Sequence, residues 1–360
     1  MPVYKDEKCG TWFSKFRYKD WTGKTKDKMK RGFKTRREAV EWETNFKARQ
    51  AGDLEMNLKS FVDIYVEERF PRLKKSTRAR KENIINTKII PYFGKRPICE
   101  ISSADVIKWQ NHLINEVDPR SGKNFTKSYL KAIHAELNAI FNYACRYYKL
   151  PINPAAVAGN IGDESEINVD FWTLDEYKKF AEEIMDVPAA YYAFEVLYWM
   201  GIREGELLAL TPKDIDFKRK TMTICKTYQV IKGEHIITSP KTNKSNRTIV
   251  MPDFLCEELM DYMEMLPNLK DDDRLFKVLS KTILFRYLKT GAEKAGVKRI
   301  RVHDLRHSHV SLLIDMGYSA VAIADRLGHE SIHVTYKYAH MFPNVQNDMA
   351  NQLNSLKDGK

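Results

Sequence analysis

The C-terminal half of the chain holds six residues whose side chains could act together on a phosphate ester. They combine fixed positive charge, proton-transfer groups and one phenol: Arg203, Lys241, His303, Arg306, His329 and Tyr338. A phosphodiester attacked by a hydroxyl passes through five-coordinate phosphorus whose equatorial oxygens gain negative charge, so a catalyst needs cationic donors aimed at them. Guanidinium groups stay charged at all relevant pH values and match phosphate oxygens two at a time. Two arginines could therefore stabilise that charge without a metal ion.

Those residues lie in four short segments, which are more informative together than singly. The segments read GIREGELLAL at 201–210, PKTNKSNRTI at 240–249, HDLRHSH at 303–309 and LGHESIHVTYKYAH at 327–340. In these motifs, their order and their spacing, the C-terminal half resembles the tyrosine recombinase family, the phage and conjugative-transposon integrases. The resemblance implies a site-specific DNA recombinase that integrates or excises a mobile element, such as a viral genome.

The resemblance also implies a place for each residue. Arg203 matches the first arginine, Lys241 the lysine of a hairpin, His303 and Arg306 the His-x-x-Arg pair, and His329 the second histidine position.

Two tyrosines compete for the position of the nucleophile. Thr335, Tyr338 and His340 fit the family's Thr-x-x-Tyr-x-His pattern, whereas Tyr336 directly follows the threonine. The resemblance therefore implies that Tyr338 is the nucleophile.

Each implied role has a physical reason. A phenol with an ordinary pKa near 10 is a poor nucleophile at neutral pH until a base or a positive field helps remove its proton, and His303 is the candidate base. The arginines would clamp the non-bridging oxygens, Lys241 would protonate the departing 5′ oxygen, and His329 would add a hydrogen bond. Attack by Tyr338 would leave a phosphotyrosyl bond and a free hydroxyl, so the step is reversible without ATP. The sequence contains no G-x-x-x-x-G-K-[ST] loop, and we expect no cofactor.

Three further residues are predicted to support this set: Glu206, His307 and His340. His303, Arg306 and His307 are spaced i, i+3 and i+4, which places them on one face of a helix. The two histidines around Asp304 also mimic the H-E-x-x-H zinc motif of metallopeptidases. A guanidinium on the same face, and an aspartate one methylene shorter than the required glutamate, disfavour zinc, so we expect no metal site.

Composition limits the remaining classes. The chain has 360 residues, a net charge of +12 and a pI of about 9.2, so nucleic acid or another polyanion is the natural partner. Five scattered cysteines without C-x-x-C spacing suit a reduced cytosolic protein. No signal-peptide pattern or long apolar run indicates secretion or a membrane partner, so we expect a cytoplasmic protein in a bacterial host cell.

The first fifty residues are the most basic segment and read as a small sheet followed by a helix. Thr11 to Tyr18 alternates like a strand, and Gly23 suits a turn before another basic stretch. Thr35 and Glu38 form a capping box, and Ala39, Trp42 and Phe46 would give the helix its apolar face. This segment resembles the three-strand-plus-helix arm-binding domain found in many integrases.

The middle of the chain reads as helical, with breakers at Pro91–Gly94 and at Ile101–Asp105. Ser102 or Ser103 would cap the helix that follows, and 126–148 would be another long helix. These signatures resemble the family's helical core-binding domain.

In the C-terminal part, an apolar run from Phe194 should form a buried helix that ends at Gly201. Segments 216–224, 228–237 and 247–251 alternate like three antiparallel strands, with a turn at 232–234, and this places Lys241 in a hairpin loop. After Pro343 an amphipathic tail follows, and the resemblance implies that it packs on a neighbouring subunit.

We therefore expect a multidomain fold of four parts. These are a small α+β arm-binding domain (1–52), an all-α core-binding domain (57–157), a linker (158–170) and a mainly α catalytic domain with a small antiparallel sheet and a tail (171–360).

The partners implied are double-stranded DNA attachment sites of core and arm type, a homotetramer formed on DNA, and an excisionase or DNA-bending accessory protein. Basic residues of the first two domains are candidates for DNA contact: Lys15, Arg17, Lys24, Lys26, Lys28, Lys74, Lys75, Arg78, Lys127 and Lys131. Two alternatives share parts of this pattern. A type IB topoisomerase-like nicking and closing enzyme would use the same chemistry, and a non-catalytic DNA-binding or architectural protein would need only the basic surface.

Overall fold

The computed structural model describes residues 3–7, 9–19, 25–51, 56–162, 170–238 and 245–328. The chain divides into two compact units, Met1–Glu166 and Ile167–Lys360, each of which is described by itself.

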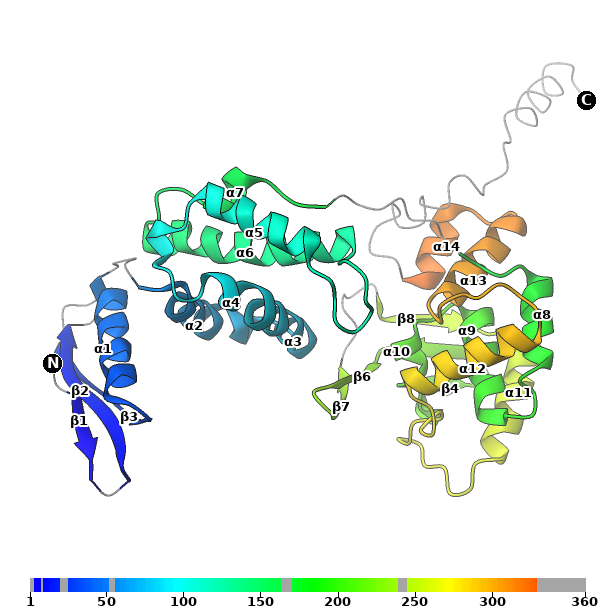
Figure 1. The fold of residues 1–360 in the computed structure, drawn as a ribbon. Coiled ribbons are helices and arrows are strands. Elements are labelled where there is room, and N and C mark those ends of the chain that lie inside the picture. Colours follow the sequence, from blue (N-terminus) through cyan, green and yellow to red (C-terminus); the bar gives the residue numbers. More distant parts are fainter. Residues whose placement is uncertain are drawn as a thin grey trace, which may run out of the picture. The chain divides into compact units, whose positions relative to one another are not determined.

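The first unit begins with a three-stranded antiparallel sheet covered on one face by a helix (Figure 1). The strands β1 (Val3–Asp6), β2 (Thr11–Lys19) and β3 (Thr25–Phe33) pair in that order, and α1 (Arg36–Ala51) follows. Phe16 is buried, with its ring centroid 5.8 Å from that of Trp42 and 5.3 Å from that of Phe46. The predicted helix cap forms, since the Glu38 amide donates to Thr35 Oγ1 at 3.2 Å. The predicted sheet-plus-helix fold is confirmed.

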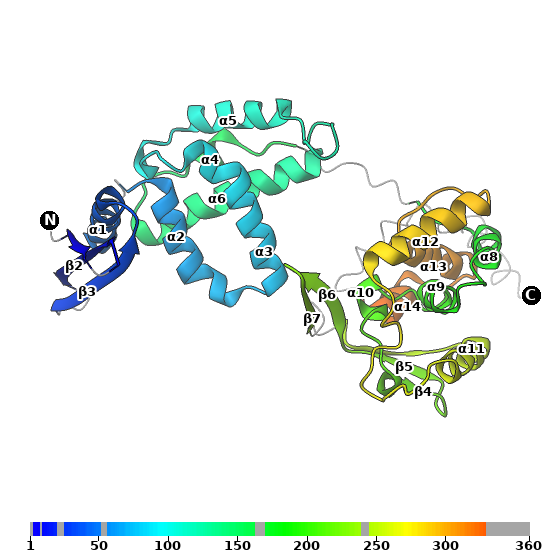
Figure 2. The same cartoon turned by 60° about the horizontal axis from the view of Figure 1, so that its bottom comes forward.

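A bundle of helices completes this unit (Figure 2). Its elements are α2 (Leu58–Arg69), η1 (Phe70–Arg72), α3 (Lys75–Ile84), η2 (Ile85–Ile89), α4 (Ile90–Phe93), η3 (Ile98–Glu100), α5 (Ser103–Asn115), α6 (Lys127–Tyr148) and α7 (Pro154–Ala158). The side chains of Ser102 and Thr126 accept from backbone amides at the starts of α5 and α6, so the expected caps are present. Buried aromatic rings from separate helices, among them Phe61, Trp109 and Phe141, form its core.

The predicted helix break at Pro91–Gly94 is confirmed, although it falls at Gly94 rather than at the proline. The chain stays helical from Lys75 through Pro91 and stops only at Gly94, because a π-helical turn at Ile85–Ile89 precedes the proline. The wider turn changes the hydrogen-bond pattern where a proline has no N–H to donate. The Trp109 indole N–H donates to the Lys88 carbonyl in this turn at 3.1 Å.

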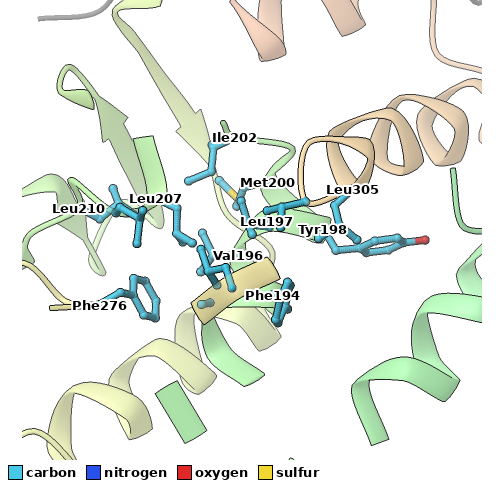
Figure 3. Packing of buried hydrophobic residues seen from close by; sticks show 14 of the residues in the cluster. Phe194, Val196, Leu197, Tyr198, Met200, Ile202, Leu207, Leu210, Phe276 and Leu305 are labelled. Carbon is cyan, nitrogen blue, oxygen red and sulfur yellow. The ribbon is translucent and has the colours of Figure 1, made fainter. Parts of the chain in front are cut away.

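The second unit is mainly helical. Its helices are α8 (Leu174–Glu182), α9 (Pro188–Met200), α10 (Glu204–Leu207), η4 (Pro212–Asp214), α11 (Asp253–Glu264), α12 (Lys281–Lys294), α13 (Asp304–Asp315) and α14 (Ala320–Leu327). Side chains of α9 such as Phe194 and Leu197 meet Leu207, Phe276 and Leu305 in one apolar core (Figure 3). Because α9 is buried along most of its length, the turn that follows it starts from a rigid support.

The strands of this unit differ from the three that we predicted. Among the described residues of this unit, five short strands form two sheets: β4 (Ile215–Asp216), β5 (Thr221–Ile224) and β8 (Arg247–Val250) in one, and β6 (Thr227–Ile231) and β7 (Glu234–Thr238) in the other. The predicted turn at 232–234 joins β6 to β7 and is confirmed, whereas the hairpin of β4 and β5 was not predicted. Lys220 in its turn has a φ of 51°, a left-handed conformation that the sequence does not reveal when the residue is not glycine.

Candidate active site

Arg203 stands in a short turn between two helices. Helix α9 ends at Gly201, whose φ is 61°, and Arg203 is the N-cap residue of α10. A Cβ atom at Gly201 would lie 2.5 Å from His309 Cδ2, so glycine is required for both conformation and space. Arg203 is partly exposed, and its Nη1 donates to Glu206 Oε1 at 2.7 Å. The turn therefore presents a guanidinium whose direction is fixed by a carboxylate.

Arg306 reaches the same turn from α13, more than a hundred residues along the chain. Its side chain is buried, with Nη1 donating to the Gly201 carbonyl at 2.8 Å and Nη2 to the Leu327 carbonyl at 2.7 Å. Leu327 is the last residue of α14. The Arg306 guanidinium thus connects the Arg203 turn to the end of α14, and three of the four predicted catalytic segments meet.

His303, the N-cap residue of α13, lies within reach of both arginine charges. Although the residue is exposed, surrounding protein partly desolvates the ring. This desolvation, followed by the positive charges of Arg306 and Arg203, lowers the pKa of His303. The imidazole is therefore neutral at neutral pH, the form that a proton acceptor needs.

Glu206 is buried and holds two arginines at once. Its Oε1 accepts from Arg203, while its Oε2 accepts from Arg247 Nη2 at 2.9 Å and from the Arg203 amide at 3.0 Å. Burial acts to raise the pKa of Glu206, but the hydrogen bond and charge of Arg247 and the charge of Arg203 lower it below its ordinary value. Arg247 is not among the site residues predicted from the sequence, although it lies only six residues after Lys241 and begins β8.

His307 and Asp304 support α13. Burial and the charge of His303 lower the pKa of His307 to about 4, so this ring is neutral near pH 7. Asp304 is buried and accepts from the Arg301 amide at 2.7 Å and from its guanidinium Nη2 at 2.8 Å. Within the described ranges, no group of three or more His, Cys, Asp or Glu residues is placed to hold a metal ion.

Several predicted site residues lie outside the described residues: Lys241, His329, Tyr338, His340 and the tail after Pro343. Their assignments remain predictions. The structure brings together Arg203, His303 and Arg306, with Glu206 behind them.

The basic residues of the sheet do not share one face. Lys15 and Arg17 pair in register with Met29 and Asp27, on the face opposite Phe16, whereas Lys28 pairs with Phe16 and lies over the Phe46 ring of α1. Arg17 also forms an ion pair with Asp27, Nε to Oδ1 3.1 Å. Lys24 lies outside the described residues, and Lys26 stands opposite Tyr18 in the backbone register.

The basic residues of the helical bundle lie near helix starts. Lys74 is the N-cap residue of α3 and Lys75 its first residue, while Lys127 begins α6 with Lys131 one turn later. Arg78 differs from these, because its guanidinium donates to the Leu73 and Pro71 carbonyls and so stabilises the turn before α3.

Comparison with protein families matches most of the chain in three parts. Residues 172–344 match the phage integrase family, residues 57–114 the N-terminal SAM-like domain of phage integrases, and residues 2–50 an arm DNA-binding domain.

The chain belongs to the phage integrase family, the tyrosine recombinases.

Two similar proteins align with this chain over most of their length. The ICEBs1 integrase of Bacillus subtilis is 28% identical over 341 residues, covering 89% of this chain and 90% of the relative. A putative prophage phiRv2 integrase of Mycobacterium tuberculosis is 24% identical over 299 residues, covering 80% and 76%.

Solved structures share the fold. The Tn1549 transposon integrase in complex with transposon right end DNA covers 85% of this chain and all of its own, with a TM-score of 0.64 at 18% identity. A lambda integrase dimer bound to a COC′ core site covers 94% of each chain, with a TM-score of 0.59 at 21% identity.

The predicted tyrosine recombinase fold is thereby confirmed, and the chain is a site-specific recombinase that acts on DNA. No helix among the described residues has the length and apolar character needed to cross a membrane.

Proposed function

We propose that this integrase cleaves and rejoins DNA through a 3′-phosphotyrosine link formed by Tyr338. In this reaction Arg203 and Arg306 hold the non-bridging oxygens, His303 accepts the phenol proton and Lys241 protonates the departing 5′ oxygen. His329 adds a hydrogen bond, and Glu206, His307 and His340 support the set.

The convergence of Arg203, His303 and Arg306 carries this proposal. They come from two turns about a hundred residues apart, yet Arg306 binds the carbonyl of Gly201, and both arginines act on His303. Fixed positive charge beside a neutral imidazole suits a reaction in which phosphate oxygens gain charge while a hydroxyl loses its proton.

Covalent trapping tests the nucleophile. The substrate is a nicked duplex that contains the DNA flanking the gene. On cleavage this duplex loses its short strand, and the protein stays attached to it. We expect Tyr338→Phe to abolish the adduct and Tyr336→Phe, its matched neighbour, to retain it. Adduct formation by Tyr338→Phe would refute the assignment.

We further propose the division of labour that the family implies. Residues 1–52 would bind arm-type sites, 57–157 core-type sites, 158–170 would link them, and 171–360 would carry out the chemistry. The basic residues on the two faces of the sheet and at the helix starts would contact phosphates.

Assembly is the final part of the proposal. Four copies would pair two duplexes, with the tail after Pro343 of each copy packed on a neighbour, and an excisionase or DNA-bending protein would assist. Truncation after Pro343 should leave binding to a single site unchanged and prevent assembly of paired sites, as measured by gel shift. Normal pairing by the truncated chain would exclude this role for the tail.

A further inference from the structure

Arg247 is a buried side chain near the site, with three hydrogen bonds, that no predicted role explains. Each of its three guanidinium nitrogens donates to a different residue: Nε to the Arg326 carbonyl at 3.1 Å, Nη1 to the nearby Ser245 carbonyl at 3.1 Å and Nη2 to Glu206 Oε2 at 2.9 Å. Its side chain is only 7% exposed and that of Glu206 only 3%.

The three acceptors belong to three parts of the proposed active site. Glu206 holds Arg203, and Ser245 stands four residues after Lys241 at the start of the described chain leading into β8. Arg326 is the next-to-last residue of α14, the last described helix of this unit, and lies three residues before His329.

Arg247 and Arg306 also act as a pair on α14. They bind the carbonyls of consecutive residues, Arg326 and Leu327, at the C-terminal end of the helix. Unpaired carbonyls and the helix dipole make this end partly negative, so two cations there are favourable. The chain that carries His329 and Tyr338 follows from this doubly bound end.

We propose that Arg247 is a positioning residue that holds the base of the Lys241 loop in register with the Arg203 turn and the end of α14. This inference rests on the proposed function and adds a residue to it. Arg247 contacts no reacting atom in this scheme and acts through Ser245, Glu206 and the end of α14.

Arginine is needed because its planar fork sends three donors in fixed directions, whereas a lysine ammonium is a point charge on a flexible stem. Arg247→Lys therefore keeps the charge that neutralises Glu206 but cannot span all three acceptors. The Lys241 loop should lose its anchor while the Glu206–Arg203 pair survives.

The test measures single-turnover cleavage on two substrates with full-length protein. On the ordinary phosphodiester, we expect Arg247→Lys to lower the rate about 100-fold, the scale of a misplaced catalytic group. On a 5′-bridging phosphorothiolate, sulfur leaves as a thiolate and needs no proton from Lys241, so most of the deficit should disappear. The dissociation constant for DNA should change by less than about threefold, since the anchor affects positioning rather than phosphate contacts.

Two variants sharpen the comparison. Arg274→Lys is the matched control, because Arg274 also binds backbone carbonyls, those of Leu208 and Lys277, but not Glu206; it should cleave both substrates normally. Glu206→Gln weakens the interaction that fixes Arg203 and leaves Arg247 its two carbonyl acceptors. The cleavage rate of Glu206→Gln should therefore remain low on the phosphorothiolate substrate.

Wild-type rates in Arg247→Lys, equal losses on both substrates, or a loss confined to DNA affinity would each overturn the proposal.

Hydrogen exchange of the backbone amides in 204–208 and 245–250 should also be faster in Arg247→Lys without DNA. This measurement remains informative even if the wild-type chain forms no adduct and the proposed function fails. Arg247→Gln serves as a second variant. Loss of cooperative melting in both variants would assign Arg247 to stability alone and refute the positioning role.

Discussion

Glu258 illustrates how one side chain can set a pH dependence far from the proposed chemistry. Its Oε2 atom is buried with no hydrogen-bond partner in the described structure, and the Tyr191 hydroxyl donates to Oε1 at a long 3.5 Å. Glu195 is nearby and buried, with its own oxygens satisfied by Tyr177 and Trp199. Burial, followed by the charge of Glu195, raises the pKa of Glu258 to about 7.

We expect Glu258→Gln to raise the melting temperature at pH 8 by a few degrees and to have little effect below pH 5. The folded-state pKa lies above the unfolded value of about 4.3, so the group's contribution is full below pH 4 and is lost as pH rises through 7. Melting curves from pH 5 to 8 measure this, with exposed Glu257→Gln on the same helix as control. A shift independent of pH would contradict the assignment.

At the scale of elements, the end of α9 decides where Arg203 stands. Gly201→Ala places a Cβ 2.5 Å from His309 and 2.8 Å from Leu327 in a left-handed conformation, so we expect a loss of about 1–3 kcal/mol in unfolding free energy. Because the Gly201 carbonyl accepts from Arg306, cleavage should fall as well. Gly296→Ala is the control, since its φ of 64° is similar but nothing lies within 4 Å. Urea unfolding and covalent trapping report the two effects, and equal losses in both variants would show that crowding at residue 201 is unimportant.

The elements nearest the site were largely predictable from sequence, and the reasons are local. An apolar run closed by Gly201, and the i, i+3, i+4 spacing from His303, both follow from helical periodicity. The hairpin of β4 and β5 was missed because Lys220, not a glycine, takes the left-handed conformation in its turn, whereas the turn at 232–234 was predicted. Arg247 was missed because two of its three partners, Glu206 and Arg326, come from distant segments, which only the folded chain brings together.

Over the whole molecule, charge and chemistry are divided between the two units. Residues 1–166 carry 33 Lys and Arg against 21 Asp and Glu, whereas residues 167–360 carry 27 of each. All of the net charge of +12 therefore belongs to the first unit, while the second contains Arg203, His303 and Arg306. Counterion release makes DNA affinity depend on how many phosphates cationic side chains neutralise.

We therefore expect the fragment 167–360, which has its own core, to retain cleavage at high protein concentration but to lose most of the affinity for DNA. Its affinity should fall only weakly with salt, whereas the whole chain should lose about 1000-fold between 50 and 200 mM salt if it neutralises six or more phosphates. Fluorescence anisotropy over that salt range measures how steeply the DNA affinity of each protein falls with salt. The fragment 1–166 should reproduce most of the salt dependence of the whole chain. An equally steep slope for 167–360 would mean that local basic clusters in the second unit, rather than the net charge of the first, govern affinity.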